Sequence, residues 1–255
     1  MFDSAKLAYA TGSAFYDYTI DGSLRFNDDD SAYLSWTPAS AGDRQVMTLS
    51  FWVKRANLTG ATNSIWGCGD GTTNNRAYLF FDSNEKLYIV SRIGGGTSYG
   101  YISDMVFRDT SAWYHIVVQI DTTEGAAADR CKFWVNGTQI STTLQNGGFP
   151  SSYNTYYNLN KDTRLGHIVT GSTQPYFDGY LAEVHFIDGT ALDATDFGET
   201  KSGVWIPKAY SGTYGTNGFY LNFSDSGAIG DDLSGNANNW TANNLAATDV
   251  VLDSP

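Results

Sequence analysis

The feature that most constrains this 255-residue chain is an alternation of apolar and polar residues with a period of two. The clearest run is 46–55, in which four apolar residues share one face: Met47, Leu49, Phe51 and Val53. Alternation of this kind is typical of a β-strand that is buried on one face and solvated on the other. The run is therefore predicted to be a half-buried strand.

Similar runs, separated by clusters of Gly, Asn, Asp and Ser, recur at the spacing of a β-sandwich. The further predicted strands are 77–82, 86–92, 99–108, 113–121, 131–135, 164–169, 176–187 and 219–223. Asn136 and Gly137 lie between two apolar runs and predict a type I′ hairpin. One short helical segment is expected at 191–199, capped by Asp193 or Thr195. The pattern predicts an all-β fold of two stacked antiparallel sheets.

The composition supports one globular core and excludes some partners. Hydrophobic residues make up 42% of the chain and aromatic residues 15%, enough to fill a core between two sheets. With 15 Lys and Arg against 27 Asp and Glu, the formal net charge is -12, which repels phosphate backbones and anionic lipids. Residues 1–20 lack the basic start and apolar core of a secretory signal, and no long apolar stretch follows. We expect no nucleic-acid partner and no membrane insertion.

Composition also divides the chain into three parts. Residues 1–22 form an N-terminal arm, residues 23–200 carry most of the strands, and residues 201–255 form an extension rich in Gly, Ser, Asn and Asp. We expect the extension to pack back on the sandwich and to fray near residues 250–255. Cys68 and Cys131 are predicted to be buried free thiols, with a bridge between them as the alternative.

Four segments carry a resemblance to a known fold family: 51–53 (FWV), 113–118 (WYHIVV), 133–137 (FWVNG) and 177–184 (FDGYLAEV). In this order they resemble signature strands of the concanavalin A-like, laminin-G-like jelly roll, over roughly residues 24–198. The resemblance implies an antiparallel two-sheet jelly-roll sandwich with inward Trp and Phe side chains between the sheets. We expect Phe51, Trp113 and Trp134 to meet in that interior.

A second resemblance runs nearly end to end. Residues 23–35 (SLRFNDDDSAYLS), 215–223 (GTNGFYLNF) and 233–241 (LSGNANNWT) resemble proteins of marine tailed bacteriophages that are virion, fibre or adhesin components. The resemblance implies a virion protein made in the cytoplasm of a bacterial host. It also implies other virion proteins as partners and assembly as a homo-oligomer.

Catalysis has to be considered, because the same fold carries glycan hydrolases and lyases. The β-glucanases of this superfamily place the motif Glu-x-Asp-x-x-Glu on one strand, so that nucleophile and general acid face the same bond. The sequence lacks that spacing. The nearest candidates are Glu183 and His185 on one face of a strand, with Asp188 on the other. Glu183 and His115 are expected to be structural, and we predict a protein that is not an enzyme.

A glycan site needs exposed aromatic rings beside polar groups on loops. The loop 149–158 holds three tyrosines among Ser, Thr and Asn, and the segment 96–101 holds two more. The candidate ligand-binding residues are therefore Tyr153, Tyr156, Tyr157, Tyr99 and Tyr101. The alternatives for the first loop are that it packs under a neighbouring segment or against another subunit.

Calcium is the cofactor that the sequence suggests, because this cation needs several carboxylate and carbonyl oxygens, and relatives with this jelly roll often bind it. The candidate ligands in the extension are Asp225, Asp231, Asp232 and Asn236. Residues 27–30, Asp70 and Asp178 are weaker candidates. The alternative is an acidic, Gly-rich surface loop.

Taken together, the residues and the resemblances predict a non-catalytic virion protein of a marine phage. It would be a tail-fibre or capsid decoration module that acts through assembly and attachment to host surface glycans. Two alternatives stay open: a glycan-degrading depolymerase on the same fold, and a free carbohydrate-binding lectin-like module.

Overall fold

The structure is a computed structural model that describes residues 16–58, 62–170 and 176–255. Within these ranges the helical segments are three 3-10 turns: η1 (Ala127–Asp129), η2 (Ala194–Asp196) and η3 (Ala247–Asp249). In the same ranges, no helix is long and apolar enough to span a bilayer. The remaining elements are β-strands, which confirms the predicted all-β class.

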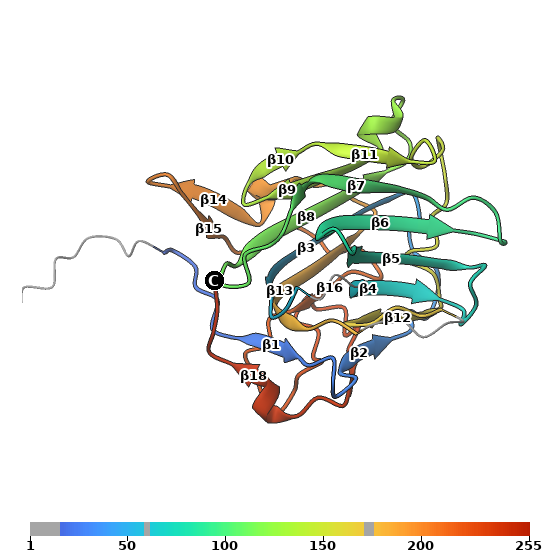
Figure 1. Ribbon diagram of the computed structural model, residues 1–255. Helices are drawn as coiled ribbons and strands as arrows, with labels where there is room; N and C mark the ends of the chain where they lie inside the picture. The colour runs from blue at the N-terminus through green and yellow to red at the C-terminus, as the bar shows by residue number, and fades with distance from the viewer. Residues whose placement is uncertain (1–15, 59–61, 171–175) are drawn as a thin grey trace, which may run out of the picture.

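One eight-stranded sheet, sheet A, has the order β10-β9-β8-β3-β13-β1-β18, and β16 pairs with β13 off this path (Figure 1). Its strands pair antiparallel. The bounds are β1 Ser23–Phe26, β3 Val46–Arg55, β8 Tyr114–Asp121, β9 Cys131–Val135, β10 Thr138–Ile140, β13 Gly179–Asp188, β16 Phe219–Leu221 and β18 Val250–Val251.

The second eight-stranded sheet, sheet B, has the order β11-β7-β6-β5-β4-β12-β2-β17 and is also antiparallel. The bounds are β2 Tyr33–Trp36, β4 Asn63–Gly69, β5 Arg76–Phe81, β6 Lys86–Arg92, β7 Tyr99–Val106, β11 Thr142–Gln145, β12 Asp162–Leu165 and β17 Thr241–Asn243. A separate two-stranded ribbon joins β14 (Gly198–Lys201) to β15 (Val204–Pro207). The predicted jelly-roll sandwich is confirmed.

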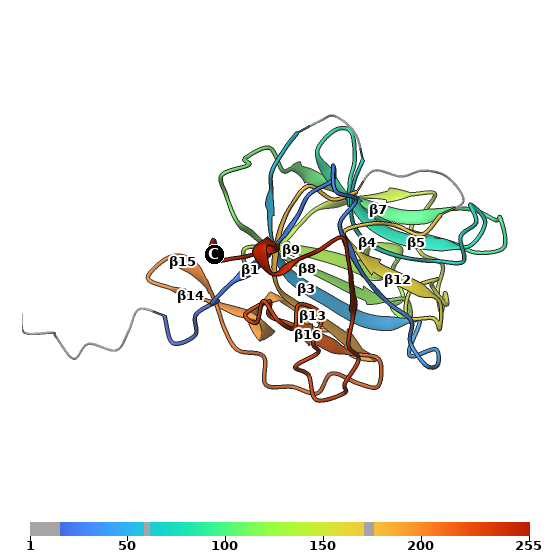
Figure 2. The same cartoon turned by 90° about the horizontal axis from the view of Figure 1, so that it is seen from below.

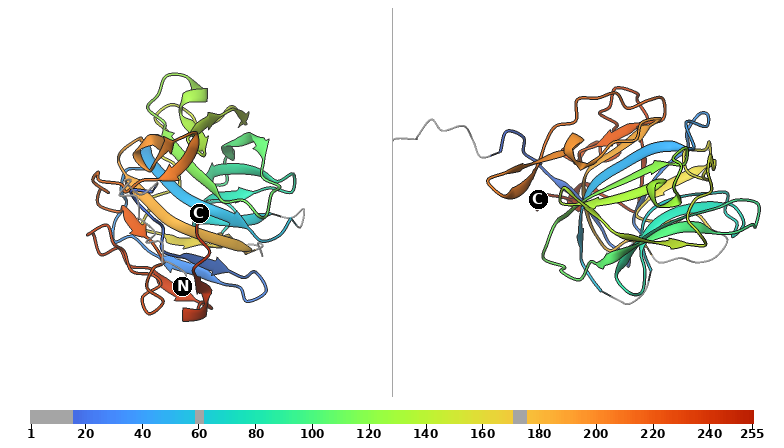
Figure 3. Two further views of the ribbon diagram at one scale, coloured as in Figure 1. Left: turned by 90° about the vertical axis from the view of Figure 1, so that its left-hand side faces the viewer. Right: turned by 90° about the horizontal axis from the view of Figure 1, so that it is seen from above.

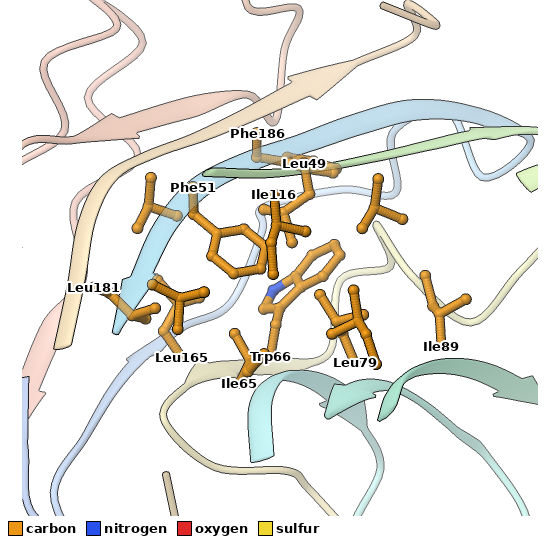
Figure 4. Close-up of a cluster of buried hydrophobic side chains, with 14 of the residues drawn as sticks. Leu49, Phe51, Ile65, Trp66, Leu79, Ile89, Ile116, Leu165, Leu181 and Phe186 are labelled. Carbon is orange, nitrogen blue, oxygen red and sulfur yellow. The ribbon is translucent and has the colours of Figure 1, made fainter. Parts of the chain in front are cut away.

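The core lies between the two sheets. Phe51 and Ile116 from sheet A meet Trp66 and Leu79 from sheet B, as Figure 4 shows. In β3 the four residues that the alternation placed on one face all point into this core, and each is 2% exposed or less. Burial of a large aromatic or aliphatic side chain contributes roughly 1.5–3 kcal/mol, so this layer supplies most of the stability of the sandwich.

The other face of sheet A is also covered, which corrects the prediction of a half-buried strand. Trp52 and Ser50 of β3 are buried beneath the ribbon and the residues that follow it. Figure 3 (right) shows β3 between sheet B on one side and the orange C-terminal segments on the other. Trp113 and Trp134 belong to this outer layer: Trp113 directly precedes β8, whose first residue points inward, and Trp134 alternates with the inward residues of β9. The expectation that they join Phe51 in the interior is wrong.

The C-terminal extension takes part in both sheets. β16 pairs with β13 in sheet A, β17 with β2 in sheet B, and β18 with β1 in sheet A. The end is held rather than frayed, because the Asp253 carboxylate lies 2.8 Å from Lys54 Nζ and accepts a hydrogen bond from Trp113 Nε1 at 3.2 Å. Residues 1–15 of the N-terminal arm lie outside the described residues. Residues 16–22 reach the outer face of sheet A, where Ile20 packs on Trp52.

Local predictions were accurate where turn chemistry is specific. Asn136 and Gly137 have φ angles of 47° and 80°, as a type I′ hairpin between β9 and β10 requires. Asp193 caps η2 by accepting a hydrogen bond from Thr195 N at 2.7 Å, so the expected helical segment is one 3-10 turn. Both cysteines are buried free thiols, as predicted, and burial raises the pKa of Cys68 to about 11.

Replacement of Phe51 by Ala should lower the free energy of unfolding by about 3–5 kcal/mol, because it opens a cavity between the sheets. Leu252 is 89% exposed, so the matched control Leu252→Ala should change stability by less than about 0.5 kcal/mol. Urea unfolding followed by tryptophan fluorescence measures both. Equal effects of the two substitutions would contradict the placement of the core.

Candidate functional site

A β-bulge in β13 sets the geometry of the outer face of sheet A. Ala182 pairs with Trp52 and His185 pairs with Ser50, so two residues of β13 oppose the single residue between them on β3. Glu183 occupies the bulge with a φ of 49°, in the left-handed region that non-glycine residues seldom adopt. The extra residue lets the adjacent residues Ala182 and Glu183 both lie on the outer face, while Leu181 and Val184 on either side of them still point into the core.

Glu183 is buried, and its carboxylate is held by phenol groups. Its Oε2 accepts a hydrogen bond from Tyr18 Oη at 2.6 Å, and its Oε1 accepts one from Tyr220 Oη at 2.8 Å. His185 lies beside them, with Nε2 3.6 Å from Glu183 Oε2 and Nδ1 2.9 Å from Tyr214 Oη. These two hydrogen bonds stabilise the charged carboxylate, whose burial without partners would cost several kcal/mol.

Above this network lies a cavity of about 290 Å³, here called the tyrosine pocket. Its lining residues are Tyr18, His185, Ala209, Tyr210, Tyr214, Tyr220 and Leu233. They come from the N-terminal segment, β13, the loop after β15, β16 and the loop after β16. Figure 2 shows β16 and these C-terminal loops packed over β13. The rings are ordered by mutual contact: Tyr220 stacks on His185 with centroids 4.3 Å apart, and Tyr210 meets Tyr214 edge-on at 5.1 Å.

A second hollow of about 230 Å³ adjoins the tyrosine pocket. The two cavities share Tyr18 and Ala209. The second is lined further by Asp17, Glu199 and Lys208, so that polar and charged side chains extend the aromatic surface. A groove with aromatic rings in one part and hydrogen-bonding groups in the next is the arrangement that sugars require.

The polar residues beneath the ribbon are sealed. The space between them has essentially no free volume, about 0 Å³, and it is lined by Ser50, Trp52, His115 and Glu183. Trp205 Nε1 donates a hydrogen bond to His115 Nδ1 at 3.1 Å, so His115 Nε2 carries the proton and faces Ser50 Oγ at 2.9 Å. Burial and the nearby His185 lower the pKa of His115 to about 3. This neutral imidazole holds the ribbon on the sheet, which is the structural role predicted for it.

None of the sequence-predicted tyrosines lines the tyrosine pocket, and three of the five lie inside the sandwich. Tyr101 and Tyr157 are 0% exposed and Tyr156 is 6% exposed. Tyr157 stacks on Trp66 between the sheets, with ring centroids 4.6 Å apart. The prediction of a surface platform is therefore wrong for these three. Tyr101 points inward from β7, and the loop carries Tyr156 and Tyr157 under neighbouring segments, which is the alternative given for the loop.

Tyr99 and Tyr153 lie at the rim of the same region and are half-buried. Their rings meet edge-on with centroids 5.6 Å apart, and Tyr153 also stacks on Phe149. Part of each ring remains accessible, so these two residues stay predicted ligand contacts.

The predicted calcium ligands are occupied by their own loop. Asp232 accepts hydrogen bonds from Tyr220 N and Asn238 N, both at 2.8 Å. Asn236 Nδ2 donates to the carbonyl of Gly215 at 2.6 Å, and Asp225 caps a turn. Across residues 16–58, 62–170 and 176–255, no group of three or more His, Cys, Asp or Glu side chains is arranged to hold a metal ion. The calcium site, including Asp231, stays a prediction, and the geometry favours the alternative of an acidic surface loop.

Sequence reasoning missed the tyrosine pocket. Tyr210, Tyr214 and Tyr220 occur within eleven residues rich in Gly, Ser and Thr, the same signal that selected the loop 149–158. No local pattern in the sequence indicated Tyr18, because its contact with Glu183 spans 165 positions. The pairing of β16 with β13 brings these distant residues together.

The fold and the groove define a lectin-like β-sandwich with a surface site. The chain belongs to the concanavalin A-like lectin/glucanases superfamily, whose model matches residues 28–196. A search of curated proteins finds no match.

Among solved structures, the chain is similar to a proposed carbohydrate binding protein from Bacteroides ovatus, with 17% identity, a TM-score of 0.57, and coverage of 93% of this chain and 62% of that one. It is also similar to a heptameric SAP-like pentraxin from Limulus polyphemus, with 15% identity, a TM-score of 0.47, and coverage of 68% and 78%. A third is the CBM40 of the Ruminococcus gnavus IT-sialidase, with 12% identity, a TM-score of 0.45, and coverage of 68% and 92%. At 17% identity, the similarity to the Bacteroides ovatus protein shows the fold alone.

The stability of the protein should depend on pH through His115. The unfolded chain binds a proton at this residue near pH 6.5, whereas the folded protein does so only near pH 3. Its contribution is fully present above pH 6.5, and acidification from there toward pH 3 lowers the free energy of unfolding by about 1.4 kcal/mol per unit at most. The variant His115→Asn should show a shallower pH dependence in urea unfolding between pH 7 and pH 4. Equal slopes would contradict a buried neutral imidazole.

Proposed function

We propose that this protein is a non-catalytic glycan-binding module that works as an attachment component of a phage virion. The observation that carries the binding role is the tyrosine pocket, in which four tyrosine rings and His185 line one accessible cavity. Ring faces pack against the apolar faces of sugars, and the adjoining polar hollow supplies partners for sugar hydroxyls. Membership of a lectin-like superfamily supports this role.

The virion role is supported by the sequence resemblance of residues 23–35, 215–223 and 233–241 to marine phage particle proteins. Two of these segments lie against the proposed site, because β16 contributes Tyr220 and the next loop contributes Leu233. Attachment to a glycan of the host surface would use this face, and assembly with other virion proteins or with further copies would use the rest of the surface.

The depolymerase alternative has less support from the site. Glu183 is the carboxylate nearest the pocket, and both of its oxygens already accept hydrogen bonds from phenol groups. Glycoside hydrolysis by the common mechanisms needs a second carboxyl group roughly 5–10 Å from the first, on the opposite side of the bond that is cleaved. The lining of the tyrosine pocket contains no carboxylate among the residues that the structure describes.

Replacement of Tyr210 by Ala should weaken binding of a recognised oligosaccharide by about tenfold or more, because a ring of the pocket is lost. The oligosaccharide is first selected on a glycan array and then titrated by calorimetry. Tyr99→Ala tests the other candidate site, and it should leave the affinity unchanged if the ligand binds in the tyrosine pocket. Loss of binding in Tyr99→Ala but not in Tyr210→Ala would move the site to the rim near Tyr153.

Incubation of the purified protein with polysaccharide from the host should release no new reducing ends, because the Glu183 carboxylate behind the pocket already accepts hydrogen bonds from phenol groups. A colorimetric reducing-end assay measures this, with heat-inactivated protein as the control. Steady release that is lost in Glu183→Gln would support the depolymerase and overturn the non-catalytic assignment.

A further inference from the structure

The tyrosine pocket has a distinctive chemistry. Its described lining is four phenol rings, one imidazole and two aliphatic side chains, without Lys or Arg. Tyr210 and Tyr214 meet edge-on at 5.1 Å, and Tyr214 and Tyr220 lie parallel at 6.4 Å between centroids. Rings this close can all lie within about 6 Å of one small cation, the range in which a cation is attracted to a ring face.

A negative charge lies directly behind these rings. The Glu183 carboxylate is 5% exposed, and it accepts hydrogen bonds from the hydroxyls of Tyr18 and Tyr220. A phenol that donates to a carboxylate becomes more electron-rich, which strengthens its attraction for a cation. The adjoining hollow carries the carboxylates of Asp17 and Glu199 and the ammonium group of Lys208, and Asp17 is paired with Lys201 Nζ at 3.1 Å, which leaves Glu199 as its further negative charge.

The electric field of the carboxylates also affects the pKa values of the tyrosines in the pocket. Burial raises the pKa of all four tyrosines above the ordinary value, and nearby carboxylates add to the increase. Glu183 acts on Tyr18, Tyr214 and Tyr220, and Asp196 acts on Tyr210. Burial, the larger cause, opposes a charge of either sign in the pocket, whereas the field of the carboxylates opposes an anion and favours a cation.

We propose that the tyrosine pocket selects a glycan bearing a positively charged amino group, such as an amino sugar with a free amine, over neutral and acidic glycans. This inference rests on the proposed function, because it names the sugar class that the same pocket takes. The ammonium group lies among the rings, where cation–π attraction and the field of Glu183 act together. The sugar ring and its hydroxyls occupy the adjoining polar hollow.

The test compares oligosaccharides that share one sugar backbone but differ in charge. Glucosamine oligosaccharides, their N-acetylated counterparts and the corresponding glucose oligosaccharides are titrated into the full-length protein by calorimetry, with sialyllactose as the anionic probe. We expect the glucosamine oligosaccharide to bind at least about tenfold more tightly than the neutral ones, and sialyllactose to bind most weakly. Raising the salt concentration from about 50 mM to about 500 mM should reduce this preference, because salt screens the attraction.

Two variants connect the preference to the pocket. Glu183→Gln keeps the shape of the side chain but removes its charge, so the preference for the charged sugar should fall several-fold. Glu124→Gln is the control, since it removes the same charge from an exposed residue between β8 and β9. If Glu183→Gln fails to fold by thermal melting, the salt dependence of the unmodified protein and the exposed variant Glu199→Gln provide the same test.

The outcomes separate the two proposals. Neutral oligosaccharides that bind as tightly as charged ones, in a way that Tyr210→Ala abolishes, would overturn the charge preference and leave glycan binding in place. A preference that persists equally in Glu183→Gln and at high salt would also overturn it. If none of these sugars binds, this inference is wrong, whereas the proposed function is overturned only if the glycan array also yields no sugar that binds.

Discussion

Burial of both faces of sheet A is the constraint on which the rest of the structure depends. β3, β8 and β13 present Phe51 and its neighbours to sheet B, and they also present Trp52 and Val117 to the opposite side. An apolar outer face of this kind must be covered, because each exposed aromatic or aliphatic side chain forgoes roughly 1.5–3 kcal/mol of burial. The ribbon, residues 16–22 and the C-terminal extension provide that cover, and the tyrosine pocket lies between them.

The bulge at Glu183 connects this packing to the chemistry of the site. In a regular strand the adjacent residues Ala182 and Glu183 would lie on opposite faces of the sheet. The additional residue instead places a carboxylate where Tyr18 and Tyr220 reach it from distant parts of the chain. A non-glycine residue at positive φ is unfavourable, so the surrounding phenol groups hold the conformation in place.

The sequence was sufficient to predict the strands whose alternation is strict and the hairpin whose turn residues are specific. It did not reveal β4, because Gly67 and Gly69 break the apolar pattern. Any Cβ there would meet Ile168 and Val169 at less than 3 Å, so the glycines are required by close approach of the chain. The sequence could not show that Trp113 and Trp134 face outward, because both faces of sheet A are apolar. The tyrosine pocket could not be predicted from the sequence, because the pairing of distant strands brings its residues together.

The pairing of the last strands has a consequence for synthesis of the protein. β18 pairs with β1 and β17 pairs with β2, so strands that are far apart in the sequence are neighbours in the sheets. A ribosome must release residues 241–251 before both sheets have their final edges. Until then, the backbone groups of β1 and β2 on that side lack partners and offer a template for another nascent chain. Rapid, crowded production of many copies would therefore favour association at these edges, unless a chaperone or an early assembly partner shields them.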